Sequence, residues 1–335
     1  QLEEIVVTAT KREASMQDIG VSVVAFDANT ISKLAITNSN DLLSRVPNLN
    51  IQTVAGETNA NIFLRGIGSQ GVSFNQQSGV GIYSDEVALN SPVVNILQTY
   101  DLERVELLRG PQNTLYGRNT TGGAVNFVSR KPDVGGEASG YLEGSFGSFD
   151  QFDVQGAYGA AIGENAAFRV SAIRQSRDGF RENGVDGNDL PEREKYAGRL
   201  QFAWEPNDRL SVNVKVHAEK IDANNYQYVV RGQRDPNDPT QPCATPYVAG
   251  QCATADGYVA PASQRKIDDD MVDPRQDVDA SGASVTVTYD LGSTTLTSIT
   301  AYEDNEQLLS DDGDGTPLPY FPFWLQSEQD QLSQE

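Results

Sequence analysis

From Gly136 onward, apolar and polar residues alternate along the chain with a period of two. In the segment 151–162 the large apolar side chains occupy even positions, and most polar side chains occupy odd ones. The same alternation recurs in 195–204, 209–219 and 283–291. Because successive side chains of a strand point to opposite faces, this pattern predicts β-strands with one apolar and one polar face.

The connections between these strands separate a soluble sandwich from a membrane barrel. Tight turns at 163–165, 206–208 and 291–293 alternate with long polar connections. The long connections span about 179–194, 222–280 and 308–326. A transmembrane β-barrel alternates in this way because its turns are short on one side of the membrane and long on the other. We therefore expect strands of an antiparallel transmembrane β-barrel.

The composition of the chain excludes further classes of protein. No run of eighteen apolar residues occurs, which excludes a transmembrane helix but leaves a barrel open. The formal net charge of −22 argues against nucleic acid as a partner. The two cysteines, Cys243 and Cys252, lie close together in the longest connection. We predict a disulfide there, in an oxidising extracellular loop, although two buried thiols in a reducing compartment are the alternative.

The predicted number of strands must be compared with the size of the domain that precedes them. The pattern gives about seven strands between Gly140 and Gln307 and an eighth that begins near Gln329. A barrel of eight strands is filled by its own side chains, yet about 130 residues of mixed α/β character precede the first strand. We expect that either this domain lies outside the barrel or the strands belong to a larger, incomplete barrel. The last residues, QDQLSQE, are still part of an alternating pattern, which favours the larger, incomplete barrel.

Five segments together carry a resemblance to a known family. They are EEIVVTAT (3–10), DLLSRVPNLNI (41–51), IFLRGIG (62–68), GVGIYSDEV (79–87) and the segment 102–132 that begins LERVELLRG. In this order they resemble TonB-dependent outer-membrane receptors. The resemblance implies a TonB-box segment at 1–12, a plug at 13–132 and part of a 22-strand barrel at 133–335. It also implies a bacterial outer-membrane protein without a cofactor.

The resemblance also implies a function and its partners. Receptors of this family use TonB, in the inner membrane, to import a scarce extracellular ligand. The usual cargo is a ferric siderophore, and haem, cobalamin and oligosaccharides are alternatives. A passive surface-binding barrel remains a second hypothesis. We find no paired catalytic carboxylates, and the single histidine, His217, gives neither a catalytic triad nor a zinc site. The sequence therefore predicts neither an enzyme nor a metal site.

Three groups of residues are candidates for the site of such a receptor. The TonB-binding segment is β-branched and uncharged, which suits strand addition, although an ordinary first strand of the plug is the alternative; it comprises Ile5, Val6, Val7, Thr8 and Ala9. By resemblance, Arg65 and Arg109 are plug arginines that pair with barrel glutamates; two exposed arginines are the alternative. Glycines expected in plug turns are Gly66, Gly68, Gly110, Gly117, Gly122 and Gly123.

Two further motifs have competing interpretations. Gly66, Gly68 and Gly71 match a dinucleotide-binding fingerprint, but no helix pattern follows Gly71, so a nucleotide-binding oxidoreductase is a remote alternative. The acidic runs 267–274 and 310–316 suggest calcium. The second run fails an EF-hand loop, because its twelfth position is Phe321 rather than glutamate. We therefore predict solvated extracellular loops for both runs.

Overall fold

The structure is a computed structural model of the 335-residue chain. It describes residues 6–8, 11–12, 14–34, 45–53, 58, 60–69, 77–94, 99–224, 227–246, 248, 250–271 and 273–335. Every structural statement below refers to these residues. Of the helices among them, none has the length and apolar character needed to cross a membrane.

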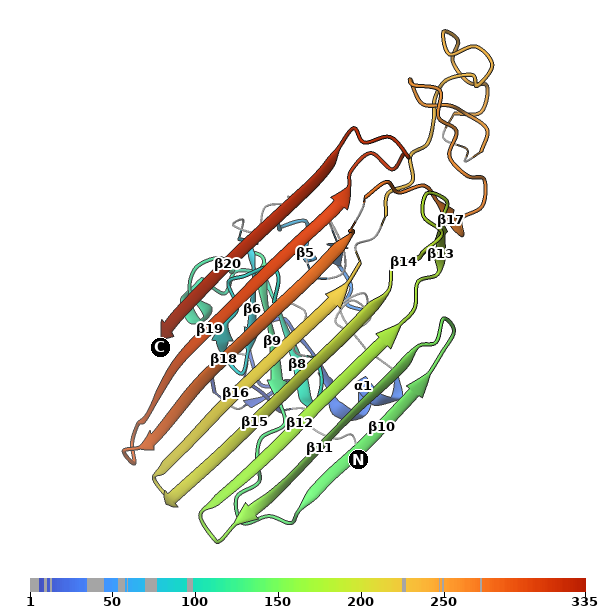
Figure 1. The fold of residues 1–335 in the computed structure, drawn as a ribbon. Helices are drawn as coiled ribbons and strands as arrows, with labels where there is room; N and C mark the ends of the chain where they lie inside the picture. The colour runs from blue at the N-terminus through green and yellow to red at the C-terminus, as the bar shows by residue number, and fades with distance from the viewer. Residues whose placement is uncertain are drawn as a thin grey trace.

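The largest element is an eight-stranded antiparallel sheet in which each strand pairs with the next long strand along the chain (Figure 1). Its strands in order are β10 (Ser139–Phe146), β11 (Phe152–Ile162), β12 (Ala166–Arg177), β15 (Arg193–Asn207), β16 (Leu210–Ala223), β18 (Arg275–Asp290), β19 (Thr295–Asp312) and β20 (Pro322–Gln334). Seven strands and the alternation of short turns with longer connections agree with the sequence pattern.

The eighth strand differs from the prediction. It begins at Pro322 rather than near Gln329, and β19 continues to Asp312, so the last connection spans only 313–321. The outward positions of β20 include Glu328 and Asp330, which carry charge. The early part of this strand, Phe323 to Leu325, is instead apolar on both faces, so an apolar–polar alternation could not identify it.

The two faces of the sheet show an inverted burial pattern. On β15, Leu200 and Trp204 are 49% and 44% exposed, whereas Lys195 and Arg199 are 6% and 3% exposed. The neighbouring strands follow the same rule, with Val216 exposed between the buried side chains Lys215 and His217. A soluble sandwich buries its apolar face. An exposed apolar face and a covered polar face are typical of a barrel wall in a membrane.

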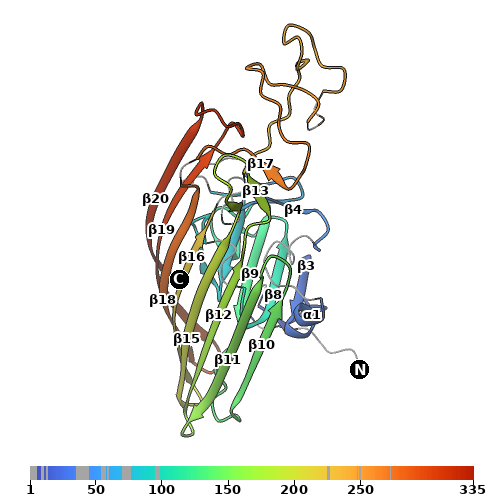
Figure 2. The same ribbon diagram turned by 45° about the vertical axis from the view of Figure 1, so that its right-hand side comes forward.

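The N-terminal domain covers the polar face of this sheet (Figures 1 and 2). Its centre is a five-stranded sheet in the order β3-β8-β9-β6-β7. These strands are β3 (Val23–Asp27), β6 (Val80–Ser84), β7 (Val87–Ala88), β8 (Leu102–Arg109) and β9 (Gly123–Ser129). Two hairpins join β1 (Val6–Val7) to β2 (Ala14–Ser15) and β4 (Leu49–Thr53) to β5 (Ala60–Leu64), and the helices are α1 (Ala28–Lys33) and α3 (Asn113–Tyr116).

One hydrophobic core joins the two domains. It contains Leu64 and Val125 of the N-terminal domain together with Val278 of β18 and Leu309 of β19. These sheet residues lie on the covered face, near the end that carries the longer connections. A small sheet of β13 (Arg181–Asn183), β14 (Asp189–Leu190) and β17 (Lys266–Ile267) stands at the same end. The N-terminal domain is thus packed against the wall rather than outside it.

Candidate functional site

Buried charges fasten the N-terminal domain to the wall. Arg169 of β12 donates two hydrogen bonds to the Asp101 carboxylate, at 2.7 and 2.6 Å. The side chains of this pair are 2% and 1% exposed. Next to it, the Arg199 guanidinium lies 4.5 Å from the centre of the Tyr100 ring and donates to the Tyr100 carbonyl. A bidentate pair with this burial fixes both distance and orientation.

A second carboxylate, Asp85, makes the matching contact further along the wall. Lys215 of β16 donates to Asp85 at 2.8 Å, and the Ser129 backbone N–H donates to the same carboxylate at 2.8 Å. Burial alone would raise the pKa of Asp85, but the charges of Lys215 and Arg199 outweigh it and hold that pKa well below its usual range. Asp85 therefore stays ionised against the wall.

The two arginines that were predicted to pair with barrel glutamates, Arg65 and Arg109, take no part in these ion pairs. Arg65 is exposed in the turn after β5, and Arg109 is half-buried at the end of β8. The two are neighbours, because Arg65 Nη1 lies 4.0 Å from the position of a Cβ on Gly110. Among the described residues neither makes an ion pair. The buried ion pairs Asp101–Arg169 and Asp85–Lys215 have the opposite polarity, with cations on the sheet and carboxylates on the N-terminal domain.

The N-terminal segment is folded back onto the first domain. Val7 is fully buried and packs with Leu108 and Tyr116. The Thr8 N–H donates to Glu106 at 2.8 Å, and Arg104 donates to the same carboxylate at 2.7 Å. Ile5 and Ala9 of the predicted TonB-binding segment lie outside the described residues. Strand pairing is limited to Val6–Val7 with Ala14–Ser15, so the segment is held by one short hairpin, the Glu106 carboxylate, a hydrogen bond from the Tyr116 hydroxyl to the Thr8 carbonyl and the packing of Val7.

This segment lies at the end of the sheet that carries the tight turns. A cavity of about 860 Å³ is lined by Thr8, Lys11 and Arg12 together with the turn 292–295. Lys11 also pairs with Glu335 at 3.0 Å. The longer connections leave the opposite end of the sheet (Figure 2). The N-terminal segment therefore lies toward the end of the wall with the tight turns, and the long connections leave the other end.

The glycines serve the packing of the first domain. Gly123 has a φ of +151°, and a Cβ there would lie 2.2 Å from the Leu108 carbonyl oxygen; at Gly68 a Cβ would lie 2.5 Å from the Phe63 ring. The turn glycines with positive φ are Gly66, Gly110 and Gly117, while Gly122 precedes β9. Gly71 and the residues 70–76, where a nucleotide-binding helix would begin, lie outside the described residues.

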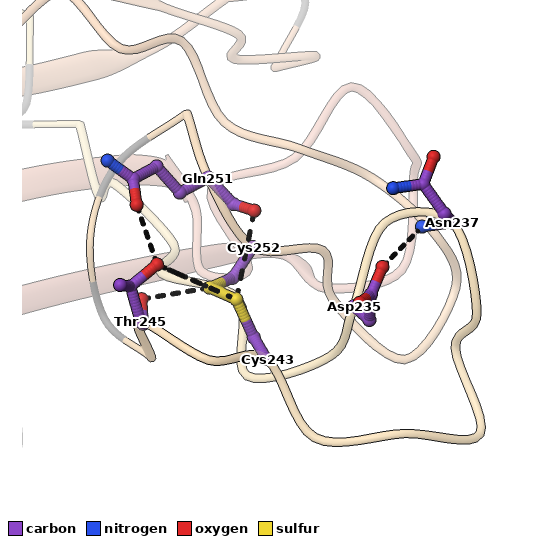
Figure 3. The surroundings of a disulfide bond; sticks show 6 residues. All are labelled: Asp235, Asn237, Cys243, Thr245, Gln251 and Cys252. Carbon is purple, nitrogen blue, oxygen red and sulfur yellow. Dashed lines mark hydrogen bonds between the residues drawn. A yellow bond between two sulfur atoms is a disulfide. The ribbon is translucent and has the colours of Figure 1, made fainter.

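The longest connection contains the disulfide. Figure 3 shows the bond between Cys243 and Cys252, whose Cα atoms are 5.8 Å apart. Thr245 donates to the side-chain oxygen of Gln251 at 2.6 Å within the loop that the bond closes. The local pair that the sequence suggested is thus within bonding geometry.

The acidic runs are not the solvated loops that the sequence predicted. Asp269, Asp311 and Asp312 are 3%, 0% and 1% exposed. The prediction failed because β18 and β19 extend further than their apolar alternation indicates. The run 268–271 then packs beside the end of β19.

Sequence reasoning also missed Asp85, Asp101 and Glu106. A signal was present, since Arg169, Arg199 and Lys215 occupy one face of consecutive long strands and require partners. The sequence did not show that a turn of the N-terminal domain would bring Asp85 to Lys215.

Comparisons with known proteins agree with this architecture. The profile of the TonB-dependent receptor plug domain matches residues 15–124. The chain is 33% identical over 211 residues to the pesticin receptor of Yersinia pestis, an alignment that covers 61% of the chain and 30% of that relative. It is 25% identical over 214 residues to the ferrichrome outer membrane transporter/phage receptor of Escherichia coli, covering 60% of the chain and 26% of the relative.

Solved structures extend the likeness to the sheet. The ferric yersiniabactin uptake receptor of Yersinia pestis matches with a TM-score of 0.70 and 24% identity, over 88% of this chain and 42% of that one. The pyoverdine outer membrane receptor of Pseudomonas aeruginosa matches with a TM-score of 0.68 and 13% identity, over 98% and 44%. The chain spans about a third of the length of the curated relatives. The chain thus contains a TonB-dependent receptor plug domain at residues 15–124, and the fold of the plug with its adjoining strand sheet is similar to that of solved outer-membrane receptors.

Proposed function

We propose that the protein imports a ferric siderophore, or a similar iron complex, across the outer membrane with energy delivered by TonB. Residues 1–12 form the TonB-binding segment, 13–132 the plug and 133–335 the first part of the barrel. The observation that carries the proposal is the position of the N-terminal segment toward the end of the wall with the tight turns, while the long connections leave the other end. Ligand capture at one end and energy input at the other require this polarity.

The names of the relatives support the choice of cargo. The ferrichrome transporter and the ferrioxamine receptor of Yersinia enterocolitica are named for siderophores. A hemin receptor is 33% identical, but over only 126 residues. The proposed role is transport without catalysis, and Arg65 and Arg109 are proposed to pair with barrel glutamates outside this sequence.

The proposal is tested by measuring uptake of iron-loaded siderophores into cells that carry the receptor at its natural length. We expect accumulation that requires both the receptor and TonB, with a panel of ferric siderophores identifying the cargo. Binding at the cell surface should persist in cells without TonB. Accumulation that continues without TonB would instead support a passive surface-binding barrel.

A further inference from the structure

Two acidic runs that lie about forty residues apart in the sequence meet at the end of the wall with the long connections. Asp269 and Asp270 follow β17, and Asp312 is the last residue of β19. One carboxylate oxygen of each residue lies within 4.8 Å of the other two. Three carboxylates at this separation repel one another unless something between them compensates their charge.

The side chains of Asn183 and Ser310 position the two runs through hydrogen bonds with the backbone, without involving these carboxylates. Asn183 of β13 donates to the Asp269 carbonyl at 2.9 Å and accepts from the Asp269 N–H at 3.0 Å. Beside it, the Ser310 hydroxyl donates to the Asp273 carbonyl at 2.5 Å. The position of the acidic groups is therefore set by the surrounding fold.

The carboxylates retain oxygens that the protein leaves unsatisfied. Asp269 Oδ1 accepts from the Met271 N–H at 2.8 Å, and Asp312 Oδ1 accepts from the Asp314 N–H at 2.9 Å. The Oδ2 atoms of both residues are buried and have no hydrogen-bond partner among the described residues. The same holds for Asp270 Oδ1. Buried polar atoms of native proteins are almost always satisfied, so each of these oxygens needs an explanation.

Among the described residues, no positively charged side chain compensates these carboxylates. Arg275, the cation that begins β18, pairs instead with Asp273 and Asp277. Across the described parts of the chain, no ion pair reaches Asp269, Asp270 or Asp312. A buried carboxylate without a cationic partner either takes up a proton or coordinates a metal ion, and three of them with oxygens this close together can share one ion.

We propose that Asp269, Asp270 and Asp312 bind a divalent cation, Ca²⁺, that ties the long connection 224–274 to the end of β19. The donor set consists only of oxygens, which suits a hard cation rather than zinc or copper. Ca²⁺ accepts irregular geometry and six to eight oxygens, so water can complete its coordination, whereas Mg²⁺ demands a near-ideal octahedron. The bound ion fixes the disulfide-bearing connection relative to the wall.

Calorimetric titration tests the site. The receptor, purified at its natural length and freed of metals and lipopolysaccharide, is titrated with Ca²⁺. We expect saturable binding with a dissociation constant on the order of 10⁻⁴ to 10⁻³ M, as in other extracellular sites. Asp269→Asn and Asp312→Asn should each weaken binding by about tenfold or more, since each removes a ligand charge. The matched control, Asp256→Asn, removes an exposed carboxylate from the same connection and should bind as the wild type does.

Hydrogen exchange of the amides in 267–271 separates cation binding from a purely structural role. Ca²⁺ should slow exchange in the wild type, while equimolar Mg²⁺ should have little effect. In chelator, the two asparagine variants should exchange more slowly than the wild type because like-charge repulsion is relieved; in Ca²⁺ this order should reverse. The proposal is overturned if the wild type shows no saturable Ca²⁺ binding, if both variants titrate like the wild type, if the exchange order does not reverse, or if Mg²⁺ protects equally.

Discussion

At the scale of single residues, the plug carboxylates that touch the wall occupy unusual backbone conformations. Asp85 and Asp101 have φ values of +50° and +49°. An L-residue in the left-handed region carries a conformational cost, although aspartate tolerates it better than most. The cost is offset where the turn presents the carboxylate to a buried cation, as Asp85 does to Lys215 and Asp101 to Arg169. At Asp85 and Asp101 the unusual backbone conformation therefore accompanies a docking contact.

Replacing Asp101 with asparagine should release this part of the plug. The substitution leaves the Arg169 guanidinium buried without its charge partner, which costs on the order of 3–5 kcal/mol. We expect the opening free energy of amides in β8 to fall by about that amount, measured by hydrogen exchange in detergent. Glu194→Gln is the control, because its ion pair with Arg174 is half exposed and worth about 1 kcal/mol or less. Equal effects of the two substitutions would contradict a special role for Asp101.

At the scale of elements, the N-terminal strand combines a shallow attachment with an extended backbone. Val7 is buried while Val6 is 45% exposed, and the strand pairs with only two residues of β2. A short strand of this kind can be withdrawn from its domain and added to the edge of another sheet. It is thus suited to leave the plug and to pair with another sheet, as the proposed binding of TonB requires.

Val7→Pro should separate energy coupling from ligand capture. Proline removes a backbone N–H and disfavours strand addition. We expect energised uptake to be abolished and equilibrium ligand binding to whole cells to remain nearly unchanged. Val6→Ala keeps the backbone donor and should leave uptake close to wild type. If uptake survives both Val7→Pro and deletion of residues 4–9, this segment is not the coupling element.

The longest connection is an element with its own crosslink. Because Cys243 and Cys252 close a short loop, the bond should stabilise that loop by about 2–3 kcal/mol and should leave the wall unaffected. Alkylation of the native receptor should label neither cysteine before reduction and both after it. Labelling of both thiols without reduction would show that the bond does not form in the outer membrane.

The elements also show what could be predicted from the sequence. Strands such as β15 and β16 were recognisable because one side chain in two faces lipid and is apolar. The start of β20 and the end of β19 were not, because Phe323 to Leu325 are apolar on both faces and β19 ends in the charged residues Asp311 and Asp312. The meeting of Asp269 with Asp312 depends on the same extended strand ends. Contacts between domains, such as Asp101 with Arg169, depend on the register of a whole sheet against a plug, which no local pattern contains.

At the scale of the whole molecule, the outward face of the sheet indicates how the wall stands in the bilayer. The outward-facing positions of β11 are apolar up to Phe152, where the strand begins. On β16 the outward-facing positions are apolar only as far as Ala218, because Lys220 follows. On β19 the first charged outward position is Asp304, which pairs with Ser281. Ser281 lies one outward position closer to the tight turns than Asp279, the partner of Lys220. Arg174 of β12 faces outward level with Lys220, so the boundary is uneven from β11 to β16, but it is lower on β19 than on β11. Tilted strands produce such an offset, because a level membrane surface crosses them at different register positions.

This orientation makes opposite predictions for the two tryptophans of the sequence. Trp204 faces outward near the tight turn after β15, beside Val212, and lies within the apolar band. Trp324 also faces outward, but it pairs with Ser310, beyond the charged positions of β19. In bilayers containing brominated phospholipids, Trp204→Phe should therefore remove fluorescence that the lipid quenches. Trp324→Phe should remove fluorescence that only an aqueous quencher reaches. If brominated lipid quenches Trp324 as strongly as Trp204, the charged row does not mark the membrane surface, and the wall must stand higher or tilt less than its outward face indicates.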